Sequence, residues 1–269
     1  MRTPLELGVV SDEISPDFRE ATRHGLGWGV TKYELRVLKS GRVPEVAPDE
    51  FADVLACVRD LRLTITALSP GVFKHSLAKP DELEREIRDT LPATIRMARE
   101  CGAPMIIVFG FHREQNDPPD GESRVVGYLR RAAALAEREG VRLAIENEPG
   151  FWCDSGANTR RIIKAVGSPA LGANWDPCNA YGTPETPYPA GYEAIKDVIV
   201  NVHVKDTKKG ALIECVTVGE GAIDWRGQIR ALMTDRPVSH LTIETHCHPL
   251  VESTRKNVET LRRLMQEEA

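Results

Sequence analysis

Short apolar runs and longer segments of helical period alternate along the whole 269-residue chain. This alternation constrains the fold strongly, because it is typical of repeated βα units whose strands form a parallel sheet. Eight strands are expected, at Leu5–Val10, Lys32–Val37, Thr64–Leu68, Met105–Phe109, Arg142–Glu146, Leu171–Asp176, Ile199–Val204 and Leu241–Glu244.

Helix start signals lie between these runs. Ser15 precedes Pro16, which predicts a capping serine and a proline at the first helical position, and Pro48 and Pro80 are each followed by two acidic residues. The helix that begins at Pro80 is expected to reach about Glu100 with an interruption at Pro92. Further helices are expected at Glu122–Glu139, Ala157–Val166, Tyr192–Lys196, Trp225–Thr234 and Glu252–Glu267.

The number of βα units and the chain length favour closure into a single (β/α)8 TIM barrel over an open α/β sheet. No Gly-x-Gly-x-x-Gly motif follows the first strand, which weakens a dinucleotide-binding alternative. Low-complexity linkers are absent, so residues 1–269 are expected to form one domain.

The charge pattern restricts the partners. The formal net charge is −5, and basic residues are interspersed with acidic ones, so the sequence argues against nucleic acid and against an anionic membrane surface. No segment approaches the roughly 20 apolar residues of a membrane span, and the first apolar run is too short for a signal peptide. Six scattered cysteines without a Cys-x-x-Cys pair fit a reducing compartment. We expect a cytoplasmic protein with a small-molecule partner.

Four successive strands end in, or carry, metal-ligand residue types: Glu146, Asp176, His203 and Glu244. Because carboxyl ends of parallel strands meet at one edge of a barrel, these side chains are expected to converge there. Each residue alone is more often a helix cap, a loop charge or a satisfied polar group. Three converging carboxylates would repel each other unless a cation lies among them, and the recurrence over four strands favours a metal site.

The composition of this ligand set indicates the metal. Carboxylates with an imidazole and no thiolate suit Mn²⁺, which is the preferred candidate, with Mg²⁺, Co²⁺ or Zn²⁺ as alternatives. One divalent ion is expected.

The series Ile-Glu-Asn-Glu-Pro-Gly, Asn-Trp-Asp-Pro-Cys-Asn, Val-His-Val-Lys-Asp and Ile-Glu-Thr-His resembles the xylose isomerase-like barrel superfamily, in its sugar phosphate isomerase/epimerase branch. The opening Val-Val-Ser-Asp-Glu-Ile-Ser-Pro-Asp and the Tyr-Glu-Leu-Arg segment look like that branch too. The resemblance implies one divalent metal held by Glu146, Asp176, His203 and Glu244. It also leaves open a homo-oligomer, since barrel relatives often pair through their helices.

The chemistry that the resemblance implies is proton transfer beside a carbonyl, through a metal-stabilised enediolate. Glu146 and Glu244 would then act as base and conjugate acid on a sugar, sugar phosphate or polyol ketone. The alternative is a metal-dependent dehydratase or lyase of an inosose-like or dehydroshikimate-like keto-polyol, for which Lys205, His246 or His112 would supply the acid. A third hypothesis is a non-catalytic barrel that binds a metabolite.

Asn179 departs from the family pattern, because relatives often have a histidine three residues after the metal-binding aspartate. In the apurinic endonucleases of the superfamily that histidine helps to hold a zinc cluster, so its replacement argues against DNA repair. Asn179 is either a substrate ligand or a turn residue.

Further substrate-binding candidates are Glu148, Lys205, His112 and Arg36. Glu148 would bind a sugar hydroxyl, and its alternative is a helix cap. Lys205 would hold an anionic group, and its alternative is an ion pair with Asp206. For His112 and Arg36, as for Glu34 and His75 elsewhere near the expected mouth, a surface position is equally consistent with the sequence.

Overall fold

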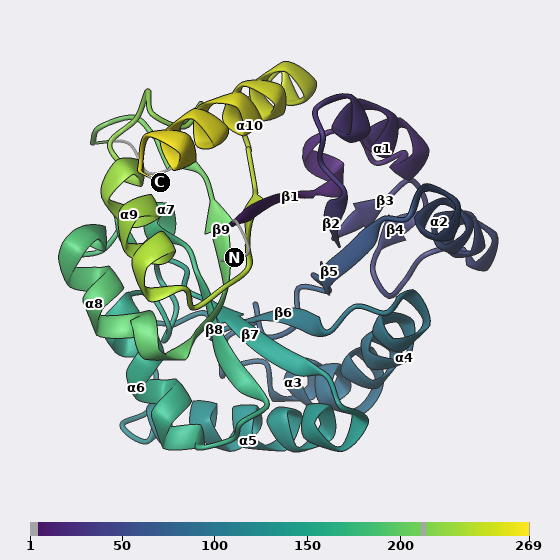
Figure 1. The fold of residues 1–269 in the computed structure, drawn as a ribbon. Coiled ribbons are helices and arrows are strands. Elements are labelled where there is room, and N and C mark those ends of the chain that lie inside the picture. The colour runs from purple at the N-terminus through teal and green to yellow at the C-terminus, as the bar shows by residue number, and fades with distance from the viewer. Residues whose placement is uncertain (1–4, 211–213, 269) are drawn as a thin grey trace.

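The computed structural model describes residues 5–210 and 214–268. Eight parallel strands close into a barrel in the order β1-β12-β9-β8-β7-β6-β5-β2, and helices form a ring outside it (Figure 1). Pairing of the first strand, β1, with the last, β12, closes the barrel. The barrel strands are β1 (Glu6–Val10), β2 (Lys32–Leu35), β5 (Thr64–Leu68), β6 (Met105–Phe109), β7 (Arg142–Glu146), β8 (Leu171–Trp175), β9 (Ile199–Val204) and β12 (His240–Ile243). The predicted (β/α)8 barrel is confirmed.

Strand positions agree with the sequence pattern because these segments are apolar and buried on both faces, as a parallel barrel requires. Every residue of β6 and β8 is buried. The expected second strand was too long, since its last residue, Val37, belongs to a separate hairpin of β3 (Val37–Leu38) and β4 (Gly41–Arg42). A second hairpin, β10 (Asp206–Thr207) with β11 (Cys215–Val216), follows β9.

The helices around the barrel also follow the expected segments. They are α1 (Phe18–Gly27), α2 (Pro48–Leu61), α3 (Pro80–Arg85), α4 (Leu91–Cys101), α5 (Gly121–Glu139), α6 (Gly156–Val166), α8 (Tyr192–Ile195), α9 (Trp225–Asp235) and α10 (Leu250–Glu267). A short helix after β8, α7 (Pro177–Ala180), was not predicted. Among the described residues, no helix has both the length and the apolar character needed to cross a membrane.

The cap of α1 differs from the prediction. Asp17, not Ser15, is the N-cap, and its carboxylate accepts hydrogen bonds from the backbone N–H groups of Arg19 and Glu20. Ser15 instead donates its hydroxyl to the Glu20 side chain at 2.7 Å. The helix starts later than expected because one carboxylate can satisfy two of the free N–H groups at the helix end.

The interruption expected near Pro92 is present as a π-helical turn, η2 (Glu86–Thr90), between α3 and α4. Proline cannot donate a backbone hydrogen bond, so the α-helical pattern cannot continue unchanged through this point. The apolar stripe still faces the barrel, since its members are all buried: Leu83, Ile87, Leu91, Ile95 and Ala98.

Candidate active site

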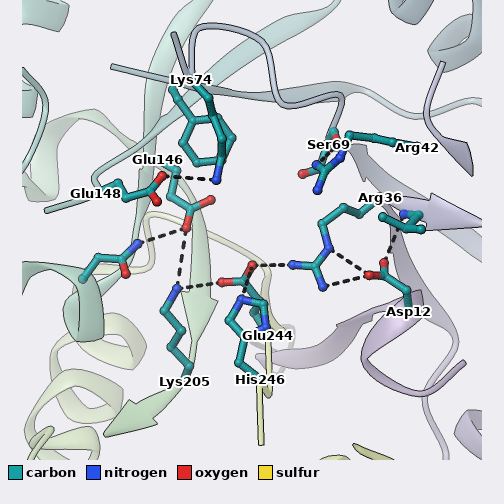
Figure 2. Close-up of a pocket in the computed structure, with 13 residues that line it drawn as sticks. Asp12, Arg36, Arg42, Ser69, Lys74, Glu146, Glu148, Lys205, Glu244 and His246 are labelled. Carbon is teal, nitrogen blue, oxygen red and sulfur yellow. Dashed lines mark hydrogen bonds and ion pairs between the residues drawn. The ribbon is translucent and has the colours of Figure 1, made fainter. Parts of the chain in front are cut away.

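A cavity of about 340 Å³ lies where the carboxyl ends of the barrel strands meet (Figure 2). Its wall combines four acidic residues with basic, polar and apolar side chains. The lining residues are Asp12, Arg36, Val37, Arg42, Ser69, Lys74, Phe109, Glu146, Glu148, Asn179, Lys205, Glu244 and His246.

The structure brings the four expected metal ligands together. Glu146 is the last residue of β7 and Asp176 follows β8, while His203 lies in β9 and Glu244 follows β12. One ligand atom from each lies within 4.8 Å of the others, and all four residues are buried. The parallel register produces this convergence, since β9 and β12 are paired at His203 and Thr242, two residues before Glu244.

The imidazole of His203 is oriented by a residue from a distant strand. His203 Nε2 donates to Glu34 Oε2 at 2.9 Å, and Ser69 donates to the other oxygen of Glu34 at 2.5 Å. His203 Nδ1 therefore faces the cluster, 3.4 Å from a Glu146 oxygen and 3.5 Å from a Glu244 oxygen. This buried nitrogen forms no hydrogen bond within the described part of the chain. Glu34 is fully buried behind His203, so a surface position is wrong for it.

Lys205 lies inside the cluster rather than at the rim. Its Nζ is 2.8 Å from Asp176 Oδ2 and 2.9 Å from Glu244 Oε2. Burial by itself would lower the pKa of Lys205, but the surrounding carboxylates raise it well above its usual value. The alternative ion pair with Asp206 is absent, because Asp206 accepts backbone hydrogen bonds from residues 207, 219, 221 and 223.

Both expected acid/base carboxylates are held in the ionised form. Burial would raise the pKa of Glu244, but nearby positive charges, first that of Lys205, hold it well below its usual value. Burial and the charge of Glu244 act in the same direction on Glu146, yet His203 and Lys205 lower its pKa overall. A carboxylate that stays ionised while buried can accept a proton from a bound molecule.

Asn179 combines the two alternatives considered for it. Its backbone N–H is capped by Asp176 at 2.9 Å, as in a turn. Its side-chain amide also lines the cavity and donates to Glu146 Oε1 at 3.1 Å and to the carbonyl of Asn147 at 2.8 Å. The short helix α7 thus aims this amide at the Glu146 carboxylate.

Arg36 reaches the cavity but is fully engaged by acidic partners. Its guanidinium donates to Glu244 at 2.7 Å, to Asp12 at 2.9 Å and to Glu13 at 2.5 Å. Although burial would lower the pKa of Arg36, these three carboxylates raise it. Arg36 fixes one oxygen of Glu244, while Lys205 contacts the other.

His246 bridges two of the same carboxylates. Its Nδ1 is 2.8 Å from Glu13, and its Nε2 is 3.2 Å from Glu244. Burial would lower the pKa of His246, but the charge of Glu244 and a hydrogen bond to Glu13 raise it to about 10. The His246 side chain is 41% exposed and lines the cavity, so a protonated imidazole faces any bound molecule.

Glu148 lies across the cavity from His246 (Figure 2). Lys74 pairs with it at 3.3 Å and stands 3.9 Å above the ring centroid of Phe109. Burial raises the pKa of Glu148, and the nearby Lys74 only partly offsets this.

Two of the expected histidines lie outside the cavity. His112 is exposed and meets the ring of Phe151 edge-on at 5.6 Å, and it is not among the lining residues. His75 Nδ1 forms a hydrogen bond with Glu86 Oε1 at 3.0 Å. Trp175 is buried, and its indole N–H donates to the side-chain oxygen of Gln228 at 3.2 Å.

Comparison with known proteins agrees with this geometry. The family model described as "xylose isomerase-like TIM barrel" matches residues 26–264. The chain belongs to the xylose isomerase-like TIM barrel family. A 2-epi-5-epi-valiolone 7-phosphate 2-epimerase from an Actinoplanes species is 32% identical to this family member over 136 residues. That alignment covers 49% of this chain and 43% of the epimerase, so this chain matches less than half of the epimerase's length.

Solved structures show the same barrel. A D-tagatose 3-epimerase-like protein has a TM-score of 0.81 at 15% identity and 98% coverage of both chains. A probable 3-DHS dehydratase from Bacillus anthracis has a TM-score of 0.79 at 16% identity, covering 96% of this chain and 99% of its own.

Several residues that line the cavity of this xylose isomerase-like barrel were not predicted from the sequence: Asp12, Val37, Arg42, Ser69, Lys74 and Phe109. Asp12 and Phe109 end or follow barrel strands, so position at a carboxyl end was a usable signal for them. Arg42 and Lys74 belong to a hairpin and a loop that carry no strand or helix period, and nothing in the sequence pattern indicates their direction.

Proposed function

We propose that this xylose isomerase-like barrel is a divalent-metal-dependent isomerase or epimerase of a small sugar, sugar phosphate or polyol ketone. The observation that carries the proposal is the convergence of Glu146, Asp176, His203 and Glu244 at the cavity, with ligand atoms within 4.8 Å of one another. The 32% identical relative is named as a 2-epimerase of 2-epi-5-epi-valiolone 7-phosphate, which agrees with this reaction class.

The residues fit a metal ion. The donor set is three carboxylates and one imidazole without thiolate, which suits Mn²⁺ first and also Mg²⁺, Co²⁺ or Zn²⁺. His203 offers a buried Nδ1 that accepts or donates no hydrogen bond among residues 5–210 and 214–268, and Glu34 holds the opposite ring nitrogen, an arrangement common behind metal-bound histidines. When bound, the metal polarises the substrate carbonyl and so acidifies the neighbouring C–H group.

The protein's own contribution is proton transfer from two sides. Glu146 and Glu244 come from β7 and the end of β12, which are separated by β8 and β9 around the barrel. A substrate carbon between them can lose a proton to one carboxylate and receive one from the other on its opposite face. Epimerisation follows directly, and isomerisation follows when the proton returns to the neighbouring carbon.

The remaining polar residues orient the reactants. Asn179 fixes Glu146, and Arg36 fixes Glu244, so neither carboxylate can rotate freely away from the substrate. Glu148 accepts hydrogen bonds from substrate hydroxyls, and Lys205 donates to a substrate oxygen between the two acids. His112 is left out of this set because it does not line the cavity.

Hydrogen exchange in D₂O tests the function. The protein with Mn²⁺ and a panel of ketoses and ketose phosphates is expected to incorporate deuterium beside the carbonyl, measured by NMR. Glu146→Gln and Glu244→Gln are each expected to slow exchange by roughly 100-fold or more, because general acid–base groups contribute about that much. Glu6→Gln is the control, because the Glu6 side chain is exposed and pairs with Lys32 rather than with a residue of the cavity. The proposal is contradicted if exchange persists in both cavity variants. It is also contradicted if none of the ketoses or ketose phosphates exchanges.

A dehydratase is the second candidate, and His246 is the observation that favours it. Its protonated imidazole, with a pKa of about 10, faces the cavity and can donate a proton to a departing β-hydroxyl. Absorbance of a conjugated enone from an inosose, or of an aromatic product from dehydroshikimate, would identify elimination. His246→Gln is expected to abolish that absorbance while deuterium exchange continues.

A further inference from the structure

The positive groups that line the cavity differ in one respect. Arg36, Lys74, Lys205 and His246 each have a carboxylate oxygen within 4.0 Å. Arg42 has none among the residues that the structure describes. Its recorded hydrogen bond is from Nη1 to the backbone carbonyl of Ser69, at 3.0 Å. We propose that Arg42 binds an oxyanion group of the substrate, so that the ketone accepted by this site is phosphorylated or carboxylated. This inference rests on the proposed function.

The hairpin after β2 sets the position of Arg42. Val37 of β3 pairs with Arg42 of β4, and the N–H of Val43 donates to the carbonyl of Arg36. The two arginines are therefore neighbours across the hairpin, but Arg36 turns to the carboxylates of Asp12 and Glu244. Arg42 and Ser69 lie together at one end of the cavity, away from Glu146, Glu148 and Lys74 (Figure 2).

The electrostatic environment gives Arg42 a reason to bind an anion. Burial and the positive charge of Arg36 lower the pKa of Arg42, and the charges of Asp12 and Glu244 offset this only in part. Arg42 is exposed at the cavity wall, and Asp12 and Glu244 act on it only as charges beyond ion-pair distance, so its guanidinium is open to a direct counter-ion. A substrate oxyanion supplies that counter-ion.

The guanidinium geometry defines the chemical class. Arginine has five N–H donors in a planar fork, and within the described ranges one of them is used, by the carbonyl of Ser69. The free donors match the paired oxygens of a phosphate or a carboxylate, which arginine binds more specifically than a neutral hydroxyl. Glu146 lies away from Arg42 in the cavity (Figure 2), so the anion would be carried at a distance from the carbon that Glu146 deprotonates.

Binding of three small probes tests the subsite directly. Glycerol 3-phosphate, glycerate and glycerol are titrated by calorimetry into the metal-loaded protein and into Arg42→Gln, Arg42→Lys and Arg96→Gln. Arg96 is an exposed residue of α4 and serves as the control. At least one anion is expected to bind more tightly than glycerol. Arg42→Gln is expected to weaken that anion by about 10- to 100-fold, as for loss of a charged hydrogen bond, and Arg42→Lys is expected to restore part of the affinity.

The outcomes are distinct. A stronger response to glycerol 3-phosphate identifies a phosphate group, and a stronger response to glycerate identifies a carboxylate. Equal binding of glycerol and both anions, or an anion preference that survives in Arg42→Gln, overturns the inference. Binding to the metal ion alone would also survive in that variant.

Turnover separates this inference from the proposed function. Deuterium exchange is compared for a ketose and its phosphate in the wild-type protein and in Arg42→Gln. We expect the phosphate to have the lower KM and Arg42→Gln to remove the difference. Exchange with equal KM values for both substrates overturns the oxyanion subsite and leaves the isomerase proposal standing. Anion binding that depends on Arg42, without exchange of any ketone, overturns the isomerase proposal and leaves the oxyanion subsite standing.

Discussion

Glu34 shows how a single buried residue can control the proposed metal site. It lies behind His203 at 2.9 Å and leaves Nδ1 as the nitrogen that faces the cluster. Glu34→Gln removes the anionic acceptor, and we expect it to weaken Mn²⁺ binding by about 10- to 100-fold, as for other residues that support metal ligands. Competition with a fluorescent chelator measures this affinity. Glu6→Gln is the matched control, and unchanged affinity in Glu34→Gln would contradict the assigned orientation.

His240 predicts how stability depends on pH. It is buried at the start of β12, and burial followed by the charge of Lys32 lowers its pKa to about 4 from the ordinary value of 6.5. Between these values the unfolded chain binds the proton and the folded chain does not, so stability rises with pH. This contribution is complete above about pH 6.5 and is lost as the pH falls through about 4.

The effect is large enough to measure. A shift of this size corresponds to about 3 kcal/mol. Urea denaturation at pH 7 and pH 4 is expected to show that the stability difference between His240→Gln and the wild-type protein changes by up to about 3 kcal/mol in favour of the variant. The same difference at both pH values would contradict the assignment.

At the scale of an element, the start of α1 tests the corrected cap. Asp17→Ala removes both hydrogen bonds to the first turn and is expected to lower the free energy of unfolding by about 1 kcal/mol. Asp17→Asn keeps an acceptor at the same place and loses the ion pair to Lys39, so it is expected to cost less. Chemical denaturation compares the two, and an equal loss in both variants would assign the effect to Lys39.

Element boundaries were predictable where one local interaction dominates. Pro48 begins α2 and Pro80 begins α3. Proline fits the first turn of a helix because the N–H group that it lacks would have no partner within the helix there. The start of α1 was not, because Ser15 and Asp17 both offer an acceptor there. Their competition is decided by which side chain reaches two N–H groups, and that depends on the backbone path from β1.

At the scale of the whole molecule, the proposed ligands belong to four different βα units, from Glu146 to Glu244. A metal that binds the folded barrel and not the unfolded chain must therefore stabilise the barrel as a whole. At 100 times its Kd it contributes about 2.7 kcal/mol, which predicts a rise in Tm of about 5 °C or more by calorimetry. The double variant with Glu146→Gln and Glu244→Gln is expected to show no rise. An equal rise in Tm in both proteins would show that the metal binds at another place in the protein.

The sequence by itself determined the barrel and the convergence of Glu146, Asp176, His203 and Glu244. Both follow from local patterns, since strand period marks the strands and parallel strands bring their carboxyl ends to one edge.

Only the tertiary structure decided the partners of these residues. Glu34 lies 169 positions from His203, Arg36 lies 208 positions from Glu244, and Glu13 lies 233 positions from His246. It also excluded His112 from the cavity and brought Arg42 and Lys74 into it. No local period encodes such contacts, because they depend on loop direction and on which strands close the barrel together.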